Sequence, residues 1–173
     1  MNSRLSEPHG MIDSPALGTI LLVEDDAADA TLLIRAFTKS GVANPIRHLR
    51  DGEQALAYLE GIGELGNREK NPLPILILLD LRLPRMSGLE LLQWMRPRKH
   101  VRRIPVVILT AERDPSYMEA AYDLGANSYL IKSPKEEDVL RLVELIQQYW
   151  IGLNEPAPLI LESRGPSFGT LHM

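Results

Sequence analysis

The stretch Ile75-Leu76-Ile77-Leu78-Leu79-Asp80 places five consecutive aliphatic residues directly before a carboxylate. An uninterrupted aliphatic run of this length is typical of a strand that is buried on both faces of a parallel sheet. In open α/β sheets, ligands bind outside the carboxyl ends of the strands. The position of Asp80 therefore predicts a chemical role, and Pro84 is expected to shape the turn into the next helix.

The composition of the chain narrows the classes of protein it can be. Its 173 residues are 45% apolar and 24% charged, which is typical of one globular domain. The net charge of -4 disfavours binding to nucleic acid, and the absence of cysteine excludes disulfides and thiolate chemistry. Since no apolar run approaches the ~20 residues of a membrane span, we expect a cytoplasmic protein that binds no membrane.

Five short apolar runs alternate with five amphipathic segments of helical spacing. The runs lie at residues 20–23, 46–49, 75–79, 106–109 and 128–131. This alternation predicts a flavodoxin-like, doubly wound α/β domain with five helices and a five-stranded parallel sheet in the order 2-1-3-4-5. We expect this domain at 19–152, between a flexible lead at 1–18 and a tail at 153–173 that is either disordered or a dimer arm.

Polar residues before the amphipathic segments predict where the helices begin. Asp26, Asp51 and Asp114 are candidate N-caps. Capping boxes are expected at Ser87-Gly88-Leu89-Glu90 and at Ser133-Pro134-Lys135-Glu136, with Pro134 as the first residue of the last helix. Residues 61–74 form a loop at the long end of the usual range.

The predicted strand ends bring acidic, hydroxyl and cationic side chains to one edge of the sheet. These are Glu24, Asp25 and Asp26 after the first strand, Asp80 after the third, Thr110 at the end of the fourth and Lys132 after the fifth. Converging carboxylates repel each other unless a cation separates them, and an all-oxygen site favours Mg²⁺. A carboxylate beside Mg²⁺ can accept a phosphoryl group, with Lys132 and Thr110 compensating its negative charge.

Several motifs together resemble a response-regulator receiver domain over about residues 19–151. They are Val23-Glu24-Asp25-Asp26, Leu79-Asp80 with Pro84 and Met86-Ser87-Gly88, Thr110-Ala111, and Tyr129 three residues before Lys132. The resemblance implies that Asp80 is the phosphoacceptor and that Glu24, Asp25 and the backbone carbonyl of Arg82 hold Mg²⁺ with it. It also implies that Thr110 and Tyr129 form a switch pair.

The resemblance further implies a partner, a sensor histidine kinase whose phosphohistidine donates the phosphoryl group. The long loop and the aromatic pair Tyr149-Trp150 look most like stand-alone regulators paired with bacterial phytochromes. Arg82 and Glu112 are candidates for tuning hydrolysis of the acyl phosphate. The chain departs from most receivers at Ser133, which separates Lys132 from a proline that usually follows the lysine directly.

Three other functions remain as alternatives. An aspartyl-phosphate phosphatase would resemble Asp-x-Asp, whereas the second position here is Arg82. A flavodoxin-like cofactor binder needs a loop of Gly, Ser or Thr after the first strand, where this chain has three acids. A receiver-like interaction module without phosphorylation would have no need of the full set of Asp25, Asp80, Thr110 and Lys132.

Two surface features bear on partners. We interpret the basic run at residues 96–103 as a solvent-exposed connection between a helix and a strand, and not as a surface that binds nucleic acid. Tyr149, Trp150 and Ile151 are candidates for a homodimer interface that includes the fourth helix, the fifth strand, the fifth helix and the tail. Because the tail is too short for a DNA-binding domain, we expect the output to be protein contact, dimer state or phosphate buffering.

Overall fold

The computed structural model describes residues 17–158, and its five strands form one parallel sheet. They are β1 (Ile20–Val23), β2 (Ile46–Leu49), β3 (Leu76–Leu79), β4 (Val106–Thr110) and β5 (Ser128–Ile131). The order is β2-β1-β3-β4-β5, as the sequence predicts. Every residue of β1, β3 and β4 is buried, whereas the edge strand β2 alternates between exposed and covered positions.

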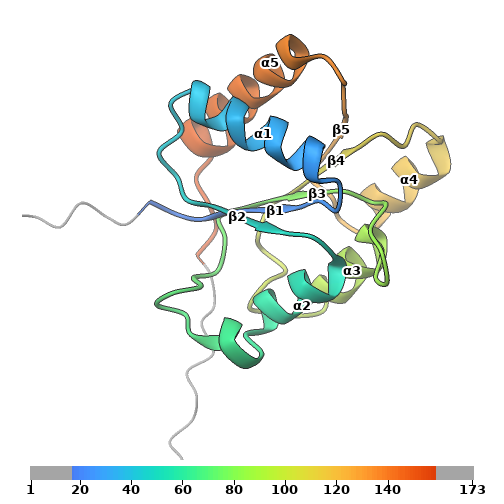
Figure 1. Cartoon of the computed structure of the whole chain (residues 1–173). Helices are drawn as coiled ribbons and strands as arrows, with labels where there is room; N and C mark the ends of the chain where they lie inside the picture. The colour runs from blue at the N-terminus through green and yellow to red at the C-terminus, as the bar shows by residue number, and fades with distance from the viewer. Residues whose placement is uncertain (1–16, 159–173) are drawn as a thin grey trace, which may run out of the picture.

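Five α-helices cover the two faces of the sheet (Figure 1). They are α1 (Ala27–Lys39), α2 (Gly52–Glu60), α3 (Gly88–Met95), α4 (Pro115–Asp123) and α5 (Glu136–Ile146). The short helix η1 (Gly63–Gly66) follows α2, and the π-helical segment η2 (Gln147–Leu153) continues α5. Apolar residues of α1 and α5 pack on one face of the sheet, and those of α2, α3 and α4 pack on the other. Because helices cover both faces of the sheet, the side chains on both sides of the central strands are buried, which explains why these strands are aliphatic.

Four of the five predicted helix starts are confirmed. Asp26 accepts hydrogen bonds from the amides of two residues in the first turn of α1. Asp51 and Asp114 each accept one such bond, at the starts of α2 and α4. Ser87 begins α3 with a complete capping box to Glu90. These side chains satisfy amides that the helices leave without a backbone partner.

The predicted start of α5 is wrong. The helix begins at Glu136, so Pro134 precedes it by two residues, and its N-cap Lys135 makes no side-chain capping bond. The Ser133 hydroxyl donates to Asp138 at 2.7 Å and accepts from the Lys135 amide at 3.2 Å. Because Glu136 pairs with Lys39 of α1, neither half of the expected capping box is available.

Two side chains fasten the long loop after α2 to that helix. The Tyr58 hydroxyl of α2 donates to the Pro72 carbonyl at 2.7 Å. The Arg68 guanidinium donates to the carbonyl oxygens of Tyr58 and Leu59, each at 2.7 Å, and to that of Asn71 at 3.3 Å. The last carbonyl groups of a helix have no hydrogen-bond donor within the helix. Here the Arg68 guanidinium donates to two of them. Arg68 therefore holds the loop against the end of α2.

Some predictions concern residues that lie outside the structure's description. Residues 1–16 of the expected lead and residues 159–173 of the expected tail belong to this group, so their flexibility and the dimer arm stay predictions. Where the described chain ends, the Pro158 carbonyl accepts a hydrogen bond from Arg103 at 3.2 Å. Within residues 17–158, no helix is long and apolar enough to cross a lipid bilayer.

Candidate functional site

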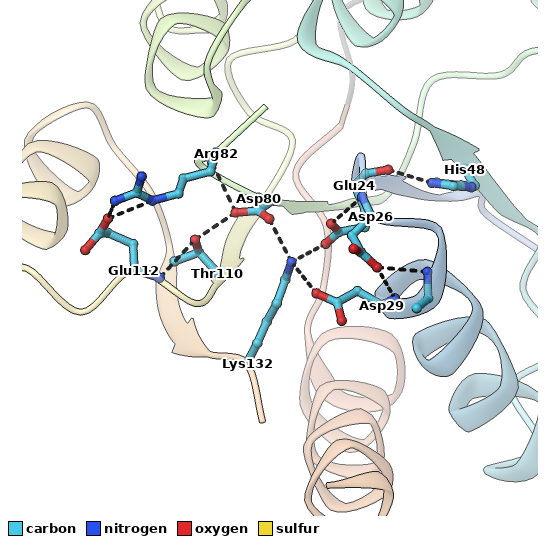
Figure 2. Close-up of polar contacts among 10 residues, drawn as sticks. Glu24, Asp26, Asp29, His48, Asp80, Arg82, Thr110, Glu112 and Lys132 are labelled. Atoms are coloured by element: carbon cyan, nitrogen blue, oxygen red, sulfur yellow. Dashed lines mark hydrogen bonds and ion pairs between the residues drawn. The ribbon is translucent and has the colours of Figure 1, made fainter. Parts of the chain in front are cut away.

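The carboxyl ends of four neighbouring strands meet at one edge of the sheet and place the predicted site residues side by side (Figure 2). Glu24 follows β1, Asp80 follows β3, Thr110 ends β4 and Lys132 follows β5. Parallel pairing aligns Val23 with Leu79, and Thr110 with Ile131. The register therefore brings together residues that are up to 108 positions apart in the chain.

Asp80 is a buried carboxylate with hydrogen-bond donors at both oxygens. Only 6% of the residue is exposed. Its Oδ1 accepts from the Thr110 hydroxyl at 2.7 Å and from the Arg82 amide at 3.1 Å, and its Oδ2 accepts from the Lys132 ammonium at 2.7 Å. These donors hold the carboxylate in one orientation at the carboxyl end of β3.

The Lys132 ammonium lies among three carboxylates. Besides Asp80, it pairs with Glu24 and, at 3.0 Å, with Asp29 of α1. Burial of the ammonium by itself favours the neutral amine. Hydrogen bonds to Asp80 and Glu24, together with their negative charges, outweigh burial and raise the pKa of Lys132. The side chain is therefore a cation throughout the physiological range.

Glu24 responds to burial in the opposite direction. With 1% of the residue exposed, loss of hydration raises its pKa to about 7, although Lys132 and a 3.0 Å hydrogen bond from the Asp26 amide favour the ionised form. The His48 ring donates to the Glu24 backbone carbonyl at 2.8 Å and fixes this turn from β2. Desolvation dominates at Glu24, whereas pairing dominates at Lys132.

Three carboxylates form a group that fits a divalent cation. Glu24, Asp25 and Asp80 each offer an oxygen, and these atoms lie within 4.8 Å of one another. A donor set of carboxylate oxygens, two of them buried, suits a hard ion such as Mg²⁺. Asp26 caps α1, as predicted. The Arg82 carbonyl stays a predicted ligand.

A second network links the site to α4. The Glu112 amide donates to the Thr110 hydroxyl at 3.3 Å, and the Tyr129 hydroxyl donates to the Glu112 carbonyl at 3.1 Å. The Arg82 guanidinium pairs with the Glu112 carboxylate and lies 5.9 Å from the centre of the Tyr117 ring. Glu112 thus contacts Thr110 and Tyr129, the predicted switch pair, and also Arg82, the other predicted rate-tuning residue.

Two residues of the site were missed by sequence reasoning. Asp29 binds Lys132 from the first turn of α1, and only its position three residues after the N-cap hinted at this. Gly88 begins α3 against the backbone of residue 80, because a Cβ at this position would overlap the Asp80 carbonyl oxygen. The Ser-Gly pair in the motif was the available signal for that close approach.

The predicted interface residues lie on the continuation of α5. Tyr149 is 55% exposed, whereas Trp150 and Ile151 are partly buried and pack against the α1 and α5 side of the core. The rings of Tyr149 and Trp150 meet edge to face at 4.9 Å. Leu153, also on this segment, is 75% exposed, so an apolar surface faces away from the domain here.

Residues 20–144 match the family model described as the response regulator receiver domain, which covers more than half of the chain. The chain belongs to this receiver family. It is therefore related to the signalling domains of two-component systems, and the resemblance found in the sequence is confirmed.

Two relatives match most of the chain. The chain is 46% identical over 140 residues to the probable methanogenesis regulatory protein FilR2 of Methanothrix harundinacea, covering 80% of this chain and 88% of that one. It is 39% identical over 132 residues to the response regulator Rcp1 of Synechocystis, covering 76% of this chain and 88% of Rcp1.

Solved structures agree with these sequence relatives. The Mn²⁺-bound form of Rcp1 superposes with a TM-score of 0.74 at 37% identity and covers 82% of this chain and 99% of Rcp1. The phosphorylated cyanobacterial phytochrome response regulator RcpA superposes with a TM-score of 0.77 at 35% identity and covers 83% of this chain and all of RcpA. The likeness to stand-alone phytochrome regulators is thereby confirmed.

Proposed function

We propose that this receiver, at residues 19–152, accepts a phosphoryl group on Asp80 from the phosphohistidine of a sensor histidine kinase. One observation carries the proposal: a buried carboxylate at a strand end has a hydroxyl and an ammonium within hydrogen-bond distance and two further carboxylates beside it. Phosphoryl transfer needs mainly positioning and compensation of negative charge, and these groups supply both.

The proposed reaction exchanges one bond to phosphorus for another. An Asp80 oxygen attacks the phosphorus, a P–O bond forms, and the P–N bond breaks so that its electron pair returns to the histidine nitrogen. Lys132 and Thr110, which now donate to Asp80, then donate to oxygens of the phosphoryl group. Their present bonds to Asp80 keep both donors beside the reacting centre.

Glu24, Asp25 and Asp80 are the side chains that would hold Mg²⁺, with the Arg82 carbonyl as a fourth ligand. When bound, the ion neutralises charge on the transferred group. The support is the all-oxygen donor set within 4.8 Å. The relative Rcp1 has a Mn²⁺-bound form, which supports the binding of a divalent ion by this chain.

The signal would leave the site through Thr110 and Tyr129. Glu112 contacts both, through its amide and its carbonyl, so movement of Thr110 toward the phosphoryl group would change the Tyr129 hydrogen bond. Such a local change biases a two-state surface formed by α4, β5 and α5. Arg82 and Glu112, which pair beside the site, would tune access of water and hence the lifetime of the acyl phosphate.

Partner choice rests on the relatives. Similarity to Rcp1 and to the phytochrome regulator RcpA supports a sensor kinase of the phytochrome type as the partner. The proposed location of the encounter is the cytoplasm, because sensor kinases take their phosphoryl group from ATP. The exposed Tyr149, with Trp150 and Ile151 beside it, supports a homodimer through the α4, β5 and α5 surface.

Intact-mass spectrometry after incubation with Mg²⁺ and a small phosphodonor tests the proposal. We expect the mass of one phosphoryl group in the wild type, none when a chelator removes the metal, and none in Asp80→Asn. Asp29→Asn is the matched control, because it removes a neighbouring carboxylate and leaves the acceptor. Phosphoryl addition that survives in Asp80→Asn would refute the assignment.

A further inference from the structure

Arg85 has an unusual backbone conformation in the segment between β3 and α3. Its φ is 65°, the only positive φ of a non-glycine residue among residues 17–158. A residue with a Cβ is disfavoured in this region, so its surroundings must stabilise the conformation. Neither the phosphoryl transfer nor the switch described above uses this side chain.

The Arg85 side chain ties this segment to the start of α2. Its guanidinium pairs with the Asp51 carboxylate, and its Nε lies 2.9 Å from an oxygen of Glu53. The Asp51 side chain is 4% exposed, and its other oxygen accepts from the Gln54 amide at 2.8 Å as the N-cap of α2. Arg85 therefore binds an anchor that helix capping has already fixed.

Backbone contacts make the same segment fit tightly between two helices. A Cβ at Gly52, the first residue of α2, would overlap the Met86 carbonyl oxygen. At the base of the segment, the Gly88 amide donates to the Leu81 carbonyl at 3.0 Å. Residues 85 and 86 thus lie against the start of α2, and the Arg85 ion pairs hold them there.

This segment also carries groups that meet the site. The Arg82 amide donates to Asp80 Oδ1 at 3.1 Å, and the Arg82 carbonyl is the ligand proposed above. We propose that Arg85 is a positioning residue for the metal site: its ion pairs with Asp51 and Glu53 hold residues 81–87 where Arg82 meets Asp80, and so strengthen divalent-cation binding. This inference rests on the proposed metal-dependent function.

Simple electrostatics predicts the opposite effect, which makes the inference testable. Removing a positive charge near a cation site should by itself strengthen cation binding. If the positioning role dominates, the loss of Arg85 weakens binding instead. Residues that orient metal ligands typically change metal affinity by about 10- to 100-fold when replaced.

The experiment titrates Mn²⁺ into the protein and measures free ion by electron paramagnetic resonance. We expect Arg85→Gly and Asp51→Asn each to weaken binding by about tenfold. Glycine accepts the positive φ, and asparagine still caps α2, so both substitutions keep the local backbone conformation. Because Arg85→Gly leaves the buried Asp51 carboxylate without its partner, thermal unfolding without metal first identifies a temperature at which every variant is folded, and binding is compared there. The double variant should bind no more weakly than either single variant, and Arg85→Lys should recover part of the affinity.

Arg50→Ala is the matched control. Arg50 is exposed, adjoins Asp51, and makes no side-chain ion pair within the described part of the chain, so its removal should leave affinity unchanged or slightly higher. If Arg85→Gly and Asp51→Asn bind Mn²⁺ as tightly as the wild type while Asp80→Asn binds it weakly, the metal site is real and the role of Arg85 is wrong. A wild type that binds no Mn²⁺ would overturn both this inference and the proposed metal dependence.

Discussion

Replacing Lys132 with methionine should expose the repulsion that the ammonium now suppresses. Methionine keeps most of the aliphatic stem and removes the charge, so the change isolates electrostatics from packing. In the wild type the ammonium pairs with Glu24, Asp29 and Asp80, and its side chain is 12% exposed. Without it, two buried carboxylates face each other across the site.

The magnitude follows from the geometry. Oxygens of Glu24 and Asp80 lie within 4.8 Å, where two unit charges repel by about 3.5 kcal/mol at an effective dielectric constant near 20. Removing one partner of a buried ion pair typically costs about 3–5 kcal/mol. We therefore expect Lys132→Met to lower the free energy of unfolding by about 3 kcal/mol at pH 8 without metal.

The loss should depend on pH because Glu24 can take up a proton. Burial raises the pKa of Glu24 to about 7 in the folded wild type, against 4.5 as its ordinary value. Between these values the folded state holds a proton that the unfolded chain has released, so stability falls as the pH rises through this window. At pH 6 most Glu24 is neutral, so Lys132→Met should lower the free energy of unfolding by less than it does at pH 8.

Urea unfolding followed by circular dichroism, at pH 6 and pH 8 with a chelator present, measures both effects. Adding Asp80→Asn to Lys132→Met should recover most of the loss, because it removes one of the two facing charges. A loss below about 1 kcal/mol at pH 8, the range of exposed ion pairs, would contradict the reasoning. So would an equal loss at both pH values.

Three further predictions concern other parts of the chain. Gly88→Ala should lower the free energy of unfolding by about 1–3 kcal/mol, since its Cβ meets the Asp80 carbonyl; an unchanged urea midpoint would contradict this close approach. Arg68→Ala should cost about 2 kcal/mol and speed proteolysis within residues 61–74, because carbonyls at the end of α2 lose their donor; equal cleavage rates would argue against this fastening. Tyr149→Ser with Leu153→Ser should convert the proposed dimer to a monomer in sedimentation; a wild-type monomer at high micromolar concentration, with or without a phosphate mimic, would exclude the dimer.

The sheet and much of the site were predictable because both depend on local pattern plus one topological rule. Continuous aliphatic runs identify buried parallel strands, and parallel strands bring their carboxyl ends to one edge. That rule alone places Glu24, Asp80, Thr110 and Lys132 together, as the structure has them. Three N-cap aspartates and the Ser87 capping box follow from residue type and spacing.

The failures depend on contacts that no local pattern encodes. Ser133 and Glu136 have the spacing of a capping box, but one binds Asp138 and the other binds Lys39, 97 positions earlier. Asp29 reaches Lys132 across 103 positions, which depends on how α1 is rotated against the end of β5. Arg68 fastens its loop through backbone carbonyls, and these have no side-chain signature.

The central claim is that Asp80 itself becomes the acyl phosphate, and locating the modified residue tests it most directly. Borohydride reduces an aspartyl phosphate to homoserine, which tandem mass spectrometry can assign to one position. After phosphorylation in Mg²⁺ and reduction, we predict homoserine at position 80 and unmodified aspartate at positions 25, 26 and 29. Homoserine at any of those three positions, or at none, would contradict the account.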